Sequence, residues 1–317
     1  MLLYLLRRIL YAVPIALAVS VVCFMLVHIS PGDPINALIS PDAPAEVVAA
    51  VRSQYGLDKP LPTQYFMWLS QVVTGNFGNS LASGQPVLGE IMKAMNNTFI
   101  LSVIAALTGF FVGCVLGSIS ALHRGTWIDK AGSTIAASGV SLPHYWLGMV
   151  LVVLFSVLLN WLPALGAGSS GSEQWVWDWE HIQYLILPAI TLSVIPMGIV
   201  TRAVRGVIVD ILHQDFVTTL RGKGLTPARI GLHVIKNAAP SLLAIMGLQL
   251  GYLMGGSILV ETVFSWPGTG LLLNGAIFQR DIPVLQGTIL LLALVFVLIN
   301  LIVDLMQTTL DPRIKRS

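Results

Sequence analysis

Charged residues are scarce in this sequence. Only 10% of its 317 residues are Asp, Glu, Lys or Arg, whereas 55% are hydrophobic. A soluble domain carries about 25% charged residues. The shortage of charge therefore excludes an ordinary soluble domain and indicates a chain that lies largely in lipid.

Residue patterns that support catalysis are also missing. Gly222-Lys223-Gly224 lacks the preceding glycine of the phosphate-binding motif GxxxxGK[ST] and lies outside any strand–helix unit. No nucleophile–base pair or cluster of metal ligands stands out, and the two cysteines, Cys23 and Cys114, lie in apolar runs as packing residues. We therefore expect a chain that is not an enzyme and that binds no cofactor or metal itself.

Long apolar runs occupy most of the sequence instead. Six runs exceed the length of about 20 residues that a helix needs to cross a bilayer. They cover approximately residues 9–29, 99–122, 132–159, 182–205, 238–260 and 284–307. The runs are continuous, which excludes a β-barrel, whose strands alternate apolar and polar residues. We predict an all-α membrane protein with six transmembrane helices in a single domain, residues 1–317.

The basic residues are distributed unevenly between the two sides that these spans define. With both termini on one side, that side holds 13 of the 17 Lys and Arg residues: Arg7, Arg8, Arg124, Lys130, Arg202, Arg205, Arg221, Lys223, Arg229, Lys236, Arg313, Lys315 and Arg316. Cytoplasmic loops are enriched in Lys and Arg, so we predict that both termini are cytoplasmic. The first run continues to about Ile29, beyond the roughly 7–15 apolar residues of a cleaved signal peptide, so we expect it to remain as a span.

Residues 206–237 form the longest cationic, water-compatible stretch between two spans in the C-terminal half. Its first part predicts a short amphipathic helix with three apolar residues on one face: Phe216, Val217 and Leu220. Gly222 and Gly224 end this helix, since glycine adopts the left-handed conformation of a helix C-terminus. Thr226 and Pro227 start another, because threonine caps free amides and proline fits the first helical position. We expect a compact knob rather than a solvated connector.

Residues 215–225 of this stretch, DFVTTLRGKGL, resemble the cytoplasmic signature loop "DYVRTARAKGL" of permease subunits in the dipeptide/oligopeptide/nickel family of ABC importers. The matching residues are Asp215, Phe216, Val217, Thr219, Arg221, Lys223, Gly224 and Leu225. Further segments are similar to the same family: YGLDKPLPTQY at 55–65, VETVFSWPG at 260–268 and LDPRI at 310–314. The general importer signature begins Glu-Ala-Ala where this chain has Thr218, Thr219 and Leu220, and Gly222 replaces an alanine. An ion pair with the ATPase would therefore involve another acid, with Asp215 as the candidate.

The resemblance implies one of two related permease subunits of an ATP-driven importer in the bacterial inner membrane. The expected partners are a sister permease, two ABC ATPase subunits that bind ATP and magnesium, and a periplasmic or lipid-anchored substrate-binding protein; no nucleic acid is expected. A short coupling helix would sit in a groove of the ATPase through Asp215, Phe216, Thr219, Leu220, Arg221, Gly222, Lys223 and Gly224. Peptides are the expected substrate, with nickel, glutathione or oligosaccharides as alternatives.

A secondary transporter or channel is the alternative from a different class. Such a protein would need charged residues at mid-membrane for an ion or proton relay. Glu261 and Asp304 lie near the ends of spans, and no charged residue lies near the centre of one. The sequence therefore favours the importer.

Four residues are candidates for the translocation pathway or its gate: Pro143, His144, Gln249 and Glu261. Pro143 cannot donate to the carbonyl of Gly139, which predicts a kink. His144 is either a packing residue with its hydrogen bonds satisfied or a substrate ligand. Gln249 either bonds a neighbouring helix, which we favour, or lines the pathway. Glu261 would be costly in lipid, so we expect it at the outer mouth, paired or hydrated.

Two stripes of glycine predict close helix packing, because small residues let helices approach in membranes. They are Gly109, Gly113 and Gly117, and Gly247, Gly251 and Gly255. The external segment 30–97 is expected to hold amphipathic helices near 45–55 and 63–74, as a cap on the membrane core or a docking surface for the binding protein. The outer loop 164–181 interleaves tryptophans with acidic residues and predicts an interfacial belt.

Overall fold

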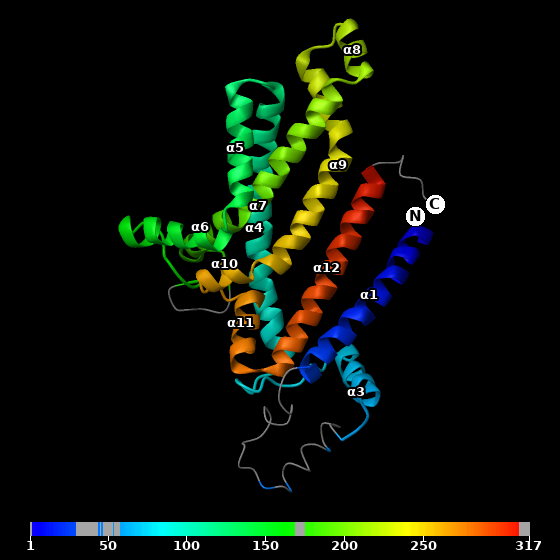
Figure 1. Ribbon diagram of the computed structural model, residues 1–317, viewed down its shortest axis with the longest axis vertical. Helices are drawn as coiled ribbons and strands as arrows, with labels where there is room; N and C mark the ends of the chain where they lie inside the picture. The colour runs from blue at the N-terminus through cyan, green and yellow to red at the C-terminus, as the bar shows by residue number, and fades with distance from the viewer. Residues whose placement is uncertain are drawn as a thin grey trace.

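The computed structural model describes residues 2–29, 58–168 and 175–310, together with the single positions 44, 46 and 53. Over these residues the chain is helical, and its only strand-like feature is an isolated bridge between Asn79 and Pro86. The long helices run alongside one another in a bundle (Figure 1). The all-α class predicted from the sequence is confirmed.

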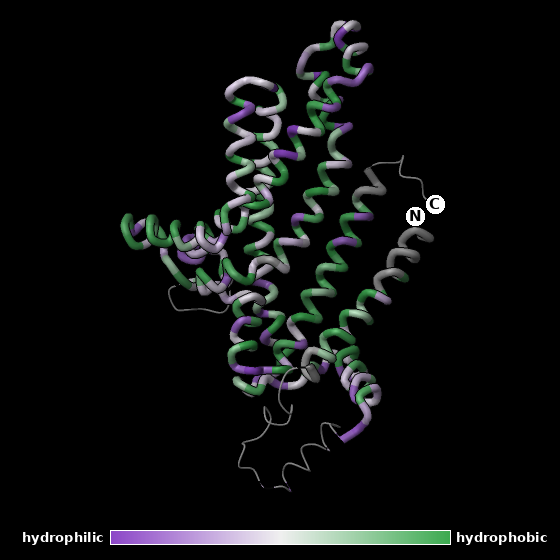
Figure 2. The backbone as a smooth tube through the Cα atoms, viewed as in Figure 1, coloured by the Kyte–Doolittle hydropathy of each residue, from purple (hydrophilic) through white to green (hydrophobic). Residues whose placement is uncertain are grey.

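The long helices of the bundle are α1 (Leu2–Ile29), α4 (Val87–Leu122), α7 (Trp179–Leu212), α9 (Pro227–Gly256) and α12 (Ile282–Leu310). Among the described residues, α4, α7, α9 and α12 are long and apolar enough to cross a membrane, and one bent pair could supply a fifth span. The apolar helical stretch Val13–Met25 of α1 is shorter than these. Hydrophobic residues follow the shafts of α9 and α12, whereas hydrophilic ones are frequent around α8 (Figure 2). Six crossings therefore stay a prediction.

The bent pair occupies the place of the predicted third span. Helix α5 (Trp127–Ser141) and the segment formed by α6 (His144–Leu151) and the π-helix η2 (Val152–Leu158) meet at an angle of 98°. Leu142 has an extended backbone there, as expected before a proline, and Pro143 leads into α6 with its fixed φ. The predicted kink at this proline is thus a complete break, and α6 points away from the bundle (Figure 1).

The first glycine stripe lies where α4 packs against α7. A β-carbon at Gly109, Gly113 or Gly117 would lie 2.7, 2.9 or 2.6 Å from a backbone carbonyl oxygen of α7. Real β-carbons do not come so close to a backbone atom, so the packing requires glycine at each position. The prediction of close approach along this stripe is confirmed.

The second glycine stripe packs only in part. Gly247 and Gly251 of α9 lie against Val303 and Phe296 of α12, whereas Gly255 has open space around its Cα. The partner of the first two glycines is therefore another helix of the same chain. Gly255 makes no such contact within the described chain.

The external helix α3 (Leu61–Val73) is confirmed near its predicted place, and Gly75 follows it with φ of 83°. The half-buried residues include Tyr65, Trp68, Leu69 and Val72, as the helical spacing predicted. Tyr65 shares a 2.8 Å hydrogen bond with Ser20 of α1. The helix predicted near 45–55 lies outside the described residues.

Candidate functional site

The predicted knob forms the tip of the bundle. Helix α8 (Asp215–Gly222) follows α7 after two residues and precedes α9 (Figure 1). Val217 is completely buried, and Phe216 and Leu220 are half-buried beside it. They belong to an apolar cluster formed with residues of α7 and α9: Ile208, Ile211, Ile230 and Val234. The apolar face predicted from the sequence is confirmed, and it ties α8 to the ends of two long helices.

The opposite face of α8 is exposed and polar. Its exposed residues are Asp215, Thr218, Thr219, Arg221, Gly222, Lys223 and Gly224. The Thr219 hydroxyl donates to the Asp215 carbonyl at 3.0 Å. Asp215 lies in the first turn and Arg221 in the last, where each charge complements the helix dipole. The structure thus gathers the predicted coupling residues on one short helix, with polar side chains outward and apolar ones inward.

The turn after α8 has the predicted glycine geometry. Gly224 has φ of 75°, its amide donates to the Arg221 carbonyl at 2.9 Å, and the Leu225 amide donates to the Leu220 carbonyl at 3.2 Å. This pair of bonds is the arrangement that closes many helix C-termini, and it needs a left-handed residue at Gly224. The prediction that Thr226 caps the next helix is wrong, because its side chain makes no capping hydrogen bond. Pro227 instead starts α9 through its fixed φ.

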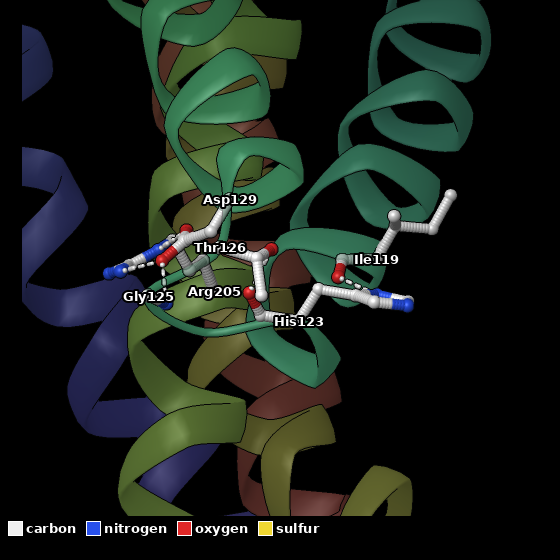
Figure 3. A network of polar contacts seen from close by, with 6 residues as sticks. All are labelled: Ile119, His123, Gly125, Thr126, Asp129 and Arg205. Carbon is white, nitrogen blue, oxygen red and sulfur yellow. Dashed lines mark hydrogen bonds and ion pairs between the residues drawn. The ribbon is translucent and has the colours of Figure 1, made fainter.

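A polar network joins the turn between α4 and α5 to α7 (Figure 3). Asp129, in the first turn of α5, accepts hydrogen bonds from Arg205 Nε at 2.5 Å and Arg205 Nη2 at 2.8 Å. The amide of Gly125 donates to the same carboxylate at 2.9 Å. Close by, Arg124 Nη1 lies 3.1 Å from His213 Nε2. Arginine can only donate, so this His213 nitrogen accepts, and Nδ1 donates to the Val209 carbonyl at 2.7 Å.

Sequence analysis missed the role of Asp129. Asp129 falls between the predicted second and third spans and was not a candidate, and Arg205 was counted only among the basic residues of one side. The signal was Arg205 itself, because a charged residue close to an apolar span needs a partner. The spacing along the chain could not identify the partner, since 76 residues separate the two.

Glu261 lies on the short helix α10 (Ile258–Val263), directly before α11 (Thr269–Gln279). Its side chain is completely buried. One carboxylate oxygen accepts from Ser257 Oγ at 2.7 Å and Thr98 Oγ1 at 2.8 Å, and the other accepts from the amides of Gly270 at 2.6 Å and Leu271 at 3.3 Å. Glu261 is thus paired rather than hydrated, and it joins α4, α10 and the start of α11.

The other three pathway candidates do not converge on one site. Pro143 forms the break before α6. Nε2 of His144 is buried and makes no hydrogen bond within the described chain. This nitrogen therefore does not fit the prediction of a packing residue with its hydrogen bonds satisfied. Oε1 of Gln249 is likewise buried without a partner there. The favoured bond from Gln249 to a neighbouring helix is therefore wrong for this atom, and the pathway role of all four residues stays a prediction.

Asp178, the residue directly before α7, is a third acidic residue with hydrogen-bonded partners. Its Oδ1 accepts from the His181 amide at 2.8 Å and lies 2.6 Å from His181 Nδ1. These two bonds hold the pKa of Asp178 below its ordinary value, and the bond from the backbone amide has the larger effect. Trp177 and Trp179 beside it are about two-thirds exposed, as expected of an interfacial belt. Among the described residues, no group of His, Cys, Asp or Glu could hold a metal ion.

Comparison with known proteins gives matches along the chain. The family described as "Binding-protein-dependent transport system inner membrane component" matches residues 113–316, and its N-terminal companion, "Binding-prot-dependent transport system membrane comp, N-term", matches residues 1–110. The glutathione transport system permease protein GsiC is 40% identical in Salmonella typhi and 41% in Escherichia coli K12, over 99% of both chains. An inward-facing MetNI methionine ABC transporter has a chain of similar fold, with TM-score 0.57 and 18% identity over 70% of this chain and 96% of that one.

Proposed function

Since this chain belongs to the family of binding-protein-dependent transport system inner membrane components, the permeases of ABC importers, we propose that it forms half of an import pathway for glutathione or a related short peptide. It is a multi-pass protein of the bacterial inner membrane. The substrate proposal rests on one observation, the full-length similarity to glutathione permeases. Glutathione is one of the alternatives to peptides that the sequence left open, and the similarity to these permeases favours it over nickel and oligosaccharides.

The proposed assembly contains a sister permease, two ATPase subunits that bind ATP and magnesium, and an external substrate-binding protein. The absence of a phosphate-binding motif from the sequence supports placing ATP hydrolysis on other chains. In the proposed topology six spans place both termini in the cytoplasm with α8. In support, the start of α1 and the end of α12 point toward the end of the bundle that carries α8 (Figure 1).

Helix α8 is the proposed contact with an ATPase subunit. Its apolar face is buried against α7 and α9, so a force on the exposed face acts on two long helices rather than on a loose loop. Its outer face offers Asp215 and Arg221 for charged hydrogen bonds and Thr219 for neutral ones. A rigid base with an exposed polar face fits a contact that must transmit motion in both directions.

Capture of the tagged chain from its native membrane in mild detergent tests the assembly, and uptake by the reconstituted complex tests the substrate. We expect two P-loop ATPases and a second permease, and uptake of labelled glutathione that needs ATP and the binding protein. Uptake of nickel or an oligosaccharide, but not glutathione, would reject the substrate. Recovery of the chain alone, while control complexes survive, would reject the importer assembly and favour a secondary transporter.

A matched pair of charge reversals tests the α8 contact. Arg221→Glu should lower ATP-driven uptake by at least about tenfold, because a like charge in an interface costs several kcal/mol. Lys236→Glu reverses another exposed charge, on α9 and away from α8, and should leave uptake unchanged. Normal uptake and normal ATPase recovery with Arg221→Glu would show that α8 is not the contact.

A further inference from the structure

We propose that Asp129 and Arg205 are a positioning pair for transport: they make helix α5, and the break at Pro143 where it ends, move together with the α7–α8 unit. The inference rests on the proposed function. The contact lies close to α8, because Arg205 is in the part of α7 nearest to α8 and Asp129 is in the first turn of α5. The second contact, Arg124 with His213, lies two residues before α8 begins.

Helix packing alone already holds α5 to α7. A β-carbon at Gly198 of α7 would lie 2.5 Å from the Ala136 carbonyl oxygen and 2.8 Å from Val140 of α5. The ion pair is therefore not needed to keep the two helices together. A charge pair taken out of water also adds little net stability, because desolvation of the charges opposes their attraction. Neither helix association nor net stability therefore explains the buried carboxylate of Asp129, whereas the geometry of its contacts does.

That geometry permits one register between the helices. Both carboxylate oxygens of Asp129 are engaged by the planar fork of Arg205, and the Gly125 amide takes a further position on one of them. Asp129 is only 4% exposed, so water cannot replace Arg205 if the helices slide. A shift of α7 would leave a buried charge unpaired unless α5 followed it. The pair therefore opposes relative motion more strongly than it favours folding.

Helix α5 leads from this pair to the middle of the molecule. It ends at the 98° break, and α6 begins directly after it. A β-carbon at Gly148 of α6 would lie 3.0 Å from the ring of Phe264, which follows α10. Motion of α8 would thus reach the segment around α10 through two rigid helices, and Asp129 with Arg205 is the charged contact at the start of this route.

Distance measurement in the complex with its ATPases tests the inference without reference to the substrate. Spin labels at positions 130 and 210, both exposed, report the separation of α5 and the part of α7 next to α8. In the otherwise unchanged complex the distance should be the same without nucleotide and with ATP trapped. In Arg205→Lys, which removes the bidentate fork, it should change or broaden when ATP binds. A change in the unsubstituted complex would overturn the proposal, as would an unchanged distance in Arg205→Lys.

Transport efficiency gives the functional readout. Arg205→Lys and Asp129→Asn should lower the substrate imported per ATP hydrolysed by about fivefold or more, the lower bound for coupled sites, with the complex still assembled. Arg202→Lys, an exposed arginine on the same helix, is the control and should keep the ratio. An unchanged ratio in both variants, even with lower thermal stability, would make the pair a structural contact only and overturn the proposal. Absence of import in the unsubstituted complex would instead reject the proposed function. The distance measurement would then still test whether Asp129 and Arg205 hold α5 to α7.

Discussion

Glu261 and Asp129 are both buried acids, but different kinds of partner satisfy them. Glu261 accepts four hydrogen bonds from neutral groups, two hydroxyls and two backbone amides. Asp129 is bonded by a guanidinium, and the side chain of Arg205 remains 33% exposed. The first acid lies where α4, α10 and α11 meet, and the second joins a turn to the shaft of α7.

Both contacts are fixed, but they join different parts of the molecule. Three of the four donors around Glu261 are buried and would each lose a hydrogen bond if α10 moved, with no water to replace it. Asp129 is likewise buried, at 4% exposed, and Arg205 holds both of its carboxylate oxygens, so a shift of α7 alone would leave this charge unpaired. We therefore expect α10 and α11 to stay attached to α4 during transport, and α5 to move together with α7 at the end of the molecule that carries α8.

Removal of the Glu261 carboxylate should have the largest effect of the substitutions considered. Glu261→Ala removes the acceptor of four donors, three of them buried, and each buried group without an acceptor costs about 1–3 kcal/mol. We expect a loss of at least about 3 kcal/mol in the free energy of unfolding. Thermal unfolding of the full chain in detergent, followed by tryptophan fluorescence, measures it, since Trp266 is buried close by and bonded to the Asn97 carbonyl at 3.1 Å.

Glu261→Gln is the matched variant. The hydroxyls of Ser257 and Thr98 can turn to accept from the new amide nitrogen, while the remaining oxygen still accepts from Gly270 and Leu271. The loss should therefore be clearly smaller than for alanine. Equal losses in the two variants would mean that charge, rather than the number of acceptors, holds this joint.

The sequence predicts some of these helix contacts and not others. The amphipathic spacing of α8, the glycines after it and the first glycine stripe depend on neighbours within a few residues or on one repeated spacing, so they could be predicted. The partners that join distant helices are different: Thr98 lies 163 residues from Glu261 and Arg205 lies 76 residues from Asp129, and nothing in local spacing indicates either one. Thr226 shows the limit in the other direction, because its residue type suits a cap but its side chain makes no capping hydrogen bond.

The α4–α7 packing supports both joints, because Thr98 lies on α4 and Asp129 follows its end. Gly117→Ala would place a β-carbon 2.6 Å from the Thr201 carbonyl oxygen and should cost about 1–3 kcal/mol by overpacking. Gly255→Ala, in the open position of the second stripe, should change stability by no more than about 1 kcal/mol, toward stabilisation, because alanine favours the helix. Thermal unfolding of the two variants compares them directly. If Gly117→Ala were neutral, the close approach of α4 and α7 would not be rigid.

Asp178 extends the comparison to an acid that is 47% exposed, and we expect the smallest effect there. Hydrogen bonds from His181 lower its pKa in the folded chain below the ordinary 3.8. Its contribution to stability is therefore complete above that value and is lost as the pH falls through the lowered pKa. Asp178→Asn should reduce the difference in unfolding temperature between pH 7 and pH 3. This reduction should be smaller than the shift in unfolding temperature that Gly117→Ala causes at pH 7. Parallel pH curves for the variant and the unsubstituted chain would show that the cap at α7 acts through its shape, so that an exposed charge adds nothing that a neutral amide cannot supply.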